Sequence, residues 1–284
     1  MIKRISRKKL DTDKYSACLN KSVNYRIYAE VFYLDALVGN NWDCYVLNDY
    51  EAVMPLPFVK KIGIKFITQP IYCQQLGVFH GENFTKETFK LFEKKLHQNL
   101  VRAYTFNEEN TEIYQPKGKL KINQIVDLKH FSQDCYSKMV KRNVNQFAKQ
   151  GLTIKENFKI KSLLKYKSEH KNHYVNTQYY EKLLTMLANH NCLDVRYVDD
   201  EDVLGFICFV KSKNRVFYLD SATSKNGRNR KVPTGILHTI LQELKGKDLI
   251  FDFEGSSIPS ISQFYNGFGA CVKNYTSYSN LNYL

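Results

Sequence analysis

The chain has 284 residues and a formal net charge of +14, because 42 lysines and arginines stand against 28 aspartates and glutamates. A hydrophobic content of 43% and a charged content of 25% are those of a globular protein and exclude an intrinsically disordered chain. No window of about 18 apolar residues is present, so we expect no membrane span. The basic N-terminus lacks an apolar segment, so no secretory signal is expected. Seven scattered cysteines without a C-x-x-C pair indicate a cytoplasmic protein and exclude the common zinc spacings.

The first part of the chain alternates between helical and strand-like patterns. The spacing of apolar residues predicts a helix over residues 24–37 and another over residues 85–97. Strands are expected at residues 43–47, 52–58, 64–69 and 99–106. The acidic, polar stretch 107–121 holds Pro116 and Gly118, so we expect a loop that closes a first domain.

A second series of elements begins near residue 122. A strand at 122–128 precedes a long helix at 132–150, which Gly151 can end in a left-handed cap. Next we expect a strand at 152–155, helices around 160–171 and 176–189, strands at 192–198, 204–211 and 215–221, a helix at 234–244, a strand at 248–253, a helix at 260–265 and a strand at 271–278. Both halves share the order helix, hairpin strands, helix, strand. We therefore expect an α/β chain of two similar domains with mixed sheets.

A basic, glycine-containing segment, TSKNGRNRKVPTG, lies between the strand at 215–221 and the helix that follows it. The start of a helix attracts anions, because its first N–H groups are unpaired and the helix dipole is positive there. Arg228, Arg230 and Lys231 would add charge-assisted contacts to a phosphate. These residues support a phosphate-binding loop, with a solvated basic loop as the alternative.

This series resembles the GNAT acyltransferase fold, in which a strand, an R/Q-x-x-G-x-G/A loop and a helix hold the pyrophosphate of coenzyme A. Arg230 and Gly235 stand at matching positions, whereas Pro233 replaces the usual glycine and removes one N–H group. Downstream, FYNGFG resembles the family's FY-x-x-x-GF element. The resemblance therefore places Tyr265 where the family has its tyrosine acid.

A narrower resemblance covers almost the whole chain. Residues 139–154 are similar to the R-x-N-x-x-x-A-x-x-x-G helix of FemAB-like aminoacyltransferases, through Arg142, Asn143, Ala148 and Gly151. The run FDFEG is similar to their YDFGG-like strand end. Those proteins carry two GNAT-like domains in tandem. The resemblance thus implies an N-terminal GNAT-like domain at residues 1–121 and a C-terminal one, with the donor-binding loop, at residues 122–284.

The activity that the resemblance implies is N-acyl transfer from an activated donor to an amine. The amine must lose a proton, and Asp252 and Glu254 are candidate bases, because residues i and i+2 of a strand face the same side. Two acids at an exposed strand end are the alternative, and Asp220 on the adjacent strand is a further candidate. Tyr265 is the candidate acid for the leaving group. An oxyanion donor is expected in a bulged strand near residues 219–222. The expected donor-binding residues are Leu219, Ser221, Arg228, Arg230, Lys231 and Gly235.

Two donors and two other classes of function stay open. Acyl-CoA is favoured, because the charged helical insertion of about 50 residues that tRNA-dependent relatives usually carry is absent. Aminoacyl-tRNA would instead use the basic stretch 138–171. A non-catalytic basic nucleic-acid-binding protein is one alternative, although no RRM, KH or helix-turn-helix signature is present. A degenerate acyltransferase fold kept as a binding module is the other. The amine acceptor is not identified.

Histidines give little support for a metal site. His170 and His173 are spaced i, i+3 on a predicted helix, but no acid at ligand spacing accompanies them, so no metal is expected. His238, on the helix after the basic segment, is expected to be a half-buried structural histidine.

Overall fold

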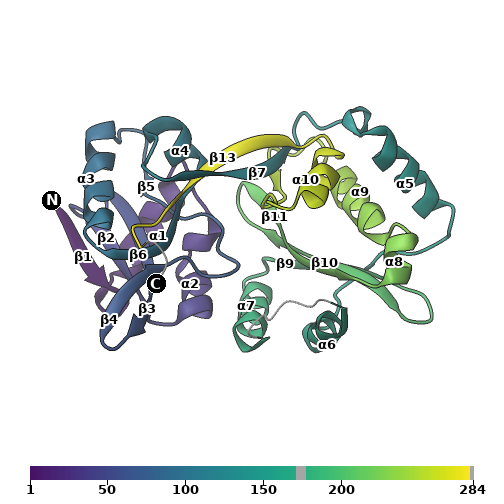
Figure 1. Ribbon diagram of the computed structural model, residues 1–284, viewed down its shortest axis with the longest axis horizontal. Helices are drawn as coiled ribbons and strands as arrows, with labels where there is room; N and C mark the ends of the chain where they lie inside the picture. Colours follow the sequence, from purple (N-terminus) through teal and green to yellow (C-terminus); the bar gives the residue numbers. More distant parts are fainter. Residues whose placement is uncertain (171–176, 282–284) are drawn as a thin grey trace. The chain divides into compact units, whose positions relative to one another are not determined.

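The computed structural model describes residues 1–170 and 177–281 and divides the chain into two compact units. Unit 1 comprises Met1–Lys121 and Asn274–Leu284, and unit 2 comprises Ile122–Lys273 (Figure 1). The sequence assigned everything after residue 121 to the second domain. The segment from Asn274 onward belongs to unit 1, however, because the last strand pairs there, Thr276–Tyr278 lying opposite Tyr104–Phe106.

Unit 1 is built on a mixed sheet with the strand order β1-β2-β3-β4-β6-β13, and β5 pairs with β3. The β4–β6 pair is parallel, and the other pairs are antiparallel. Its strands are β1 (Ile2–Ser6), β2 (Trp42–Leu47), β3 (Ala52–Lys61), β4 (Ile64–Thr68), β5 (Phe79–His80), β6 (Leu100–Phe106) and the end of β13 (Cys271–Tyr278). Its helices are α1 (Thr12–Lys21), α2 (Val31–Val38), α3 (Lys86–His97) and α4 (Glu108–Tyr114), with 3-10 turns at Arg7–Lys9 and Ile27–Ala29.

Two predictions for unit 1 were wrong in detail. The helix expected at residues 24–37 begins only at Val31, because Asn24 and Arg26 are buried in polar contacts. The Asn24 amide donates to Val78 O at 2.8 Å, and Arg26 pairs with Glu109 at 2.7 Å. The loop expected from residue 107 contains α4, whose first turn is capped by the Asn107 side chain.

Unit 2 has the strand order β7-β12-β11-β10-β9-β8, in which only β11 and β12 run parallel. Its strands are β7 (Lys119–Asp127), β8 (Lys155–Glu156), β9 (Leu193–Asp199), β10 (Val203–Lys211), β11 (Arg215–Thr223), β12 (Ile250–Asp252) and the start of β13. Its helices are α5 (Lys138–Ala148), α6 (Ile160–His170), α7 (Thr177–Asn189), α8 (Lys225–Asn229), α9 (Val232–Leu244) and α10 (Pro259–Asn266), with a 3-10 turn at Gln133–Cys135.

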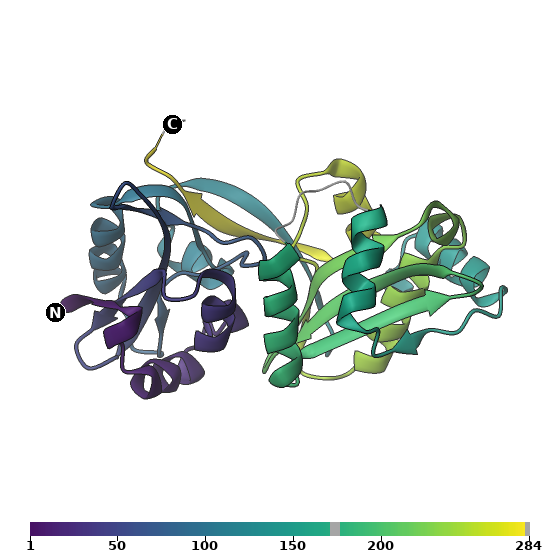
Figure 2. The same cartoon turned by 90° about the horizontal axis from the view of Figure 1, so that it is seen from below.

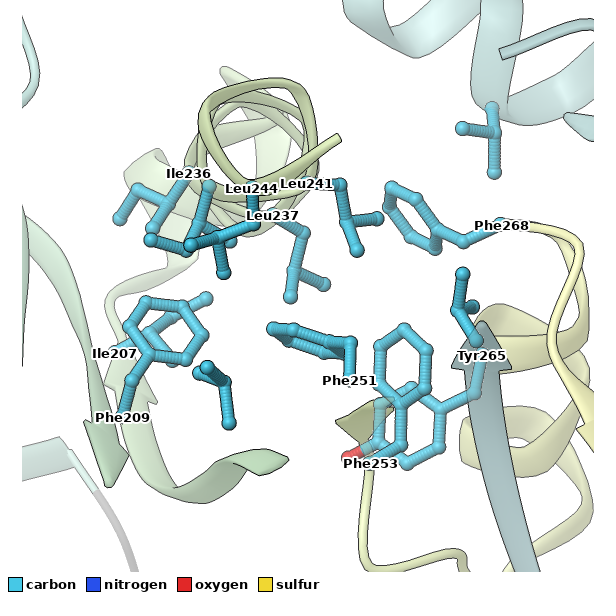
Figure 3. Packing of buried hydrophobic residues seen from close by; sticks show 14 of the residues in the cluster. Ile207, Phe209, Ile236, Leu237, Leu241, Leu244, Phe251, Phe253, Tyr265 and Phe268 are labelled. Atoms are coloured by element: carbon cyan, nitrogen blue, oxygen red, sulfur yellow. The ribbon is translucent and has the colours of Figure 1, made fainter. Parts of the chain in front are cut away.

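The helices of unit 2 cover both faces of its sheet. Helices α5 and α9 lie on one face, and α6 and α7 lie on the other, as Figure 1 and the turned view in Figure 2 show. Apolar residues of α9, including Leu237 and Leu241, pack onto Phe251 and its neighbours in the core (Figure 3). Burial of this kind stabilises a fold by about 25 cal/mol for each Å² of apolar surface removed from water.

The close approach of α5 and α9 depends on a glycine. A methyl group on Gly235 would lie 2.4 Å from the Phe147 ring, so only glycine fits between these helices. The helix expected at residues 132–150 is interrupted, because α5 starts afresh at Lys138 with Ser137 as its cap. The basic segment before residue 236 is likewise not an open loop, since α8 and the first turn of α9 occupy most of it.

Candidate active site

A cavity of about 480 Å³ opens in unit 2 where β11 and β12 stop pairing. The two strands pair only as far as Phe217 and Asp252. Strand β12 ends there, whereas β11 continues to Thr223 and forms one wall of the cavity. The chain then turns at Glu254 and Gly255, both in the left-handed region with φ of 57° and 58°. The end of a parallel strand pair therefore opens onto a hollow that side chains can line.

The wall that β11 provides contains a β-bulge. Cys208 of β10 lies opposite Asp220, but the next residue, Phe209, lies opposite Tyr218. Leu219 is the extra residue, with no partner across the ladder, and it lines the cavity. The bulge falls within the stretch 219–222 where the sequence analysis expected one. A bulge of this kind changes the direction in which backbone N–H groups point.

Tyr265 reaches the cavity from α10. Its ring stacks on Phe253, with 4.5 Å between ring centroids (Figure 3). It also meets the ring of Tyr218 edge-on, with 5.8 Å between centroids. Burial raises the pKa of Tyr265 far above its usual range, and the negative charges of Glu254 and Asp220 raise it further. The phenol therefore stays protonated at neutral pH and carries a hydrogen for a hydrogen bond to a group in the cavity.

Asp252 and Glu254 lie in different surroundings. Asp252 is buried, accepts hydrogen bonds from Asn123 at 3.0 Å and Arg215 at 2.7 Å, and does not line the cavity. Glu254 lines the cavity and is half-buried. The strand alternation that was expected to put both acids on one side does not reach Glu254, because β12 ends at Asp252. Instead the Glu254 backbone N–H donates to Asp252 at 2.8 Å, so the buried acid fixes the turn that presents Glu254.

Another cavity-lining residue, Asp220, belongs to a buried ion pair. Asp220 of β11 pairs with Lys167 of α6, and both side chains are almost inaccessible to solvent. The Lys167 ammonium also lies 4.0 Å from the centroid of the Tyr180 ring, a cation–π contact. Asp220 is thus held in place beside the cavity by a cationic side chain from helix α6.

The six residues expected to bind the donor fall into two groups. Leu219, Ser221 and Arg228 line the cavity, and Arg228 also donates to Thr223 O at 2.6 Å. Arg230, Lys231 and Gly235 do not line it. The Arg230 guanidinium instead donates to Gln150 at 3.0 Å and pairs with Asp200 at 2.7 Å.

Of the remaining candidates, His170 lines this cavity, whereas His238 does not. The Tyr136 hydroxyl lies 3.4 Å from His238 Nδ1, and burial lowers the pKa of His238. His173 lies outside the described residues, so its pairing with His170 is not described. Within residues 1–170 and 177–281, no group of three or more His, Cys, Asp or Glu side chains is arranged to hold a metal ion. No helix in these ranges combines the length and apolarity needed to cross a membrane.

Comparison with known proteins identifies the fold. The chain matches no protein-family model and no curated protein sequence. The crystal structure of FemX matches 98% of this chain and 97% of its own with a TM-score of 0.69 at 11% identity. A tandem GNAT protein from the clavulanic acid biosynthesis pathway matches 100% of both chains with a TM-score of 0.53 at 10% identity. An acetyltransferase from the GNAT family of Colwellia psychrerythraea matches 99% of this chain and 100% of its own with a TM-score of 0.56 at 9% identity.

The chain has the tandem GNAT fold of these proteins. The α/β class and the resemblance to FemAB-like GNAT proteins, both expected from sequence, are confirmed at the level of fold.

Sequence reasoning missed the buried ion pair between Lys167 and the cavity-lining Asp220. Lys167 was counted within a basic stretch of α6, where its neighbours Lys161 and Lys165 are exposed to solvent. Its partner Asp220 lies 53 residues further along the chain, so no local motif connects the two. One signal was available, because Lys167 lies four residues after the buried Leu163 and therefore on the inner face of the helix.

Proposed function

We propose that this chain is an N-acyltransferase that moves an acyl group from acyl-CoA to an amine in the cavity of unit 2. One observation carries the proposal: a protonated phenol, a carboxylate and a bulged strand line the same cavity where β11 and β12 separate. The tandem GNAT neighbour, whose description says that it was solved without AcCoA, and the acetyltransferase of the same fold support this class of reaction.

The reaction requires two proton transfers, and the cavity offers a group for each. The amine nitrogen attacks the acyl carbonyl, the carbon–sulfur bond breaks, and the new amide nitrogen loses its proton. Glu254 is the proposed base, directly or through one water molecule, and Tyr265 is the proposed acid that protonates the leaving thiolate. Each transfer by a well-placed group contributes about 10² to 10⁴ in rate.

The developing negative charge on the carbonyl oxygen needs a donor as well. The proposed donor is the backbone of the bulge at Leu219, which faces the cavity and lacks a partner residue on β10. Backbone donors are already oriented before the reaction, so they stabilise the transition state without reorganisation. Asp252 is proposed as a positioning residue, because it holds the backbone N–H of Glu254.

Arg228 is the proposed contact for the phosphates of the donor. It lines the cavity together with Pro233 of α9, whose N-terminus carries the positive end of the helix dipole. Arg230 serves as a matched control, since its guanidinium is held by Asp200 and Gln150.

Isothermal titration with acetyl-CoA tests this assignment. We expect Arg228→Ala to weaken binding about tenfold or more, because a charge-assisted contact contributes about 1.5–3 kcal/mol. Arg230→Ala should leave the affinity within about twofold. Equal losses in both variants would contradict the assignment of Arg228.

Aminoacyl-tRNA is the second candidate donor, and a specific feature favours it. Helix α5 exposes Lys138, Lys141, Arg142 and, at its end, Lys149, a basic surface that an acyl-CoA donor does not require. Thermal unfolding with millimolar acetyl-CoA, and separately with tRNA, distinguishes the two donors. A ligand at about 100 times its dissociation constant adds about 2.7 kcal/mol of stability. A rise in the unfolding midpoint with tRNA alone would overturn the acyl-CoA proposal.

A further inference from the structure

The hairpin between β3 and β4 in unit 1 ends in an unusual turn. Ile62 and Gly63 form the two-residue loop between the paired residues Lys61 and Ile64, with φ of 49° and 76°. Two successive residues with positive φ define the type I′ turn, for which Asn-Gly is the ordinary choice. A β-branched residue in this backbone region is strained. Ile62 is nevertheless present, and its relative accessibility is 102%. Its side chain therefore contributes neither to the turn nor to the core of unit 1.

Further exposed apolar residues lie next to this tip. The register pairs Val59 with Phe66, and Phe66 in turn with Leu100 of β6. Directly paired residues project from the same face of a sheet, and so do residues i and i+2 of a strand. Ile64, two residues before Phe66 in β4, therefore lies on the same face. Val59, Ile64 and Leu100 are all exposed. Strands β3, β4 and β6 thus carry an apolar face that continues to the Ile62 tip.

Positive charge surrounds this apolar face. Residues 52–81 and 98–107 contain no aspartate or glutamate. Lys61, paired with Ile64, is exposed, and the Arg102 guanidinium lies 4.9 Å from the centroid of the Phe66 ring. Among the described residues, the acidic side chain in contact with this hairpin is that of Asp43. Its carboxylate lies 2.7 Å from the Lys65 ammonium. Long cationic side chains of this kind cover apolar surface with their stems and hold their charges at its edge.

We propose that the Ile62 tip and this apolar face bind the surface of an anionic lipid bilayer. The aliphatic side chains would enter the boundary between headgroups and acyl chains, while Lys61 and Arg102 contact the headgroups. A nucleic acid would satisfy the cations but would leave the aliphatic side chains in water. Strain at Ile62 is consistent with an apolar side chain retained for contact with a partner. The proposal does not depend on the acyltransferase chemistry of unit 2.

Vesicle flotation with the full chain tests the proposal. We expect binding to vesicles of phosphatidylcholine with about 30 mol % phosphatidylglycerol, and at least tenfold weaker binding to phosphatidylcholine alone. Binding should weaken as salt rises, because surface charges are screened. Lys61→Ala should weaken binding about fivefold, the effect of one cation near an anionic surface.

Ile62→Asn separates a binding role from a structural one. Asparagine suits the turn, so this variant should unfold at the same or a higher temperature, while its binding to anionic vesicles falls about tenfold or more. Ile113→Asn is the matched control, because Ile113 is an exposed isoleucine on α4 of the same unit and lies outside the apolar face. Its binding should equal that of the unchanged chain.

Several results would overturn the proposal. One is equal binding of the chain to both kinds of vesicle, and another is undiminished vesicle binding by Ile62→Asn. A third is a lower unfolding temperature of Ile62→Asn, because it would show that Ile62 stabilises the fold. Loss of tRNA binding in Lys61→Ala without any loss of vesicle binding would assign the cations to nucleic acid instead.

Discussion

Tyr265 illustrates how one residue serves both packing and proposed chemistry. Its ring belongs to the core of unit 2 through its stack on Phe253, and the same residue lines the cavity. Phenylalanine retains the ring and removes only the hydroxyl, so the two roles are separable by a single substitution.

We expect Tyr265→Phe to lower kcat about a hundredfold or more while changing stability little. A general acid contributes about 10² to 10⁴ to the rate, and the packed ring is kept. Steady-state kinetics and urea unfolding on the same preparation measure both effects. An unchanged kcat would show that another group protonates the leaving group.

The two neighbouring acids should respond differently to neutralisation. Asp252→Asn leaves the Arg215 guanidinium buried beside a neutral amide, and breaking a buried ion pair costs about 3–5 kcal/mol. Glu254→Gln should instead lower kcat and leave the free energy of unfolding within about 1 kcal/mol. Comparing urea midpoints and kcat for both variants tests this division. A stable Asp252→Asn variant with normal kcat would refute its positioning role.

At the scale of elements, helices α5 and α9 of unit 2 pack closely against each other. Gly235 allows the two helices to meet at the Phe147 ring. The resemblance gave Gly235 a role in binding the donor, but its N–H group donates within α9 to Lys231 O at 3.0 Å. Close helix packing is therefore a sufficient reason for glycine at this position.

Gly235→Ala should destabilise unit 2 by about 1–3 kcal/mol, the usual cost of overpacking a core. The methyl group would force the Phe147 ring or the helix to shift. Adding Phe147→Leu should recover part of the loss by making space. Urea unfolding of the single and double variants measures the recovery; a double variant no more stable than Gly235→Ala would contradict the contact.

At the scale of the whole molecule, both units bury tyrosine hydroxyls. Burial raises the pKa of Tyr15 and Tyr104 in unit 1 and of Tyr218 and Tyr265 in unit 2 well above their usual value. Because the raised values belong to the folded state, the stability they contribute is complete below the unfolded pKa of about 10 and is lost as pH rises above it.

Unfolding free energy should therefore fall steeply above pH of about 10, by up to about 1.4 kcal/mol per pH unit for each such tyrosine. Tyr265→Phe should make this decline shallower, because it removes one titrating group. Urea titrations at several alkaline pH values provide the slopes. Identical slopes for the two proteins would show that Tyr265 ionises as readily in the folded state as in the unfolded one.

Local patterns in the sequence determined much of the element order. The last strand was predicted at its observed bounds, Cys271–Tyr278, and the helix expected at 85–97 is α3. The recognisable series of strand, basic segment, helix and FYNGFG was sufficient for the fold. Such features depend on residues close together in the chain, through turn preferences and the periods of helix and strand.

Tertiary structure alone decided the composition of the cavity and the partners of its charged groups. It joined Lys167 to Asp220, turned Arg230 toward Asp200, and brought the segment after Asn274 back to β6. These contacts depend on which elements become neighbours, and residues far apart in sequence carry no local pattern that records the pairing. The sequence by itself therefore determined the kind of fold, whereas the packing of distant elements decided which side chains meet in the site.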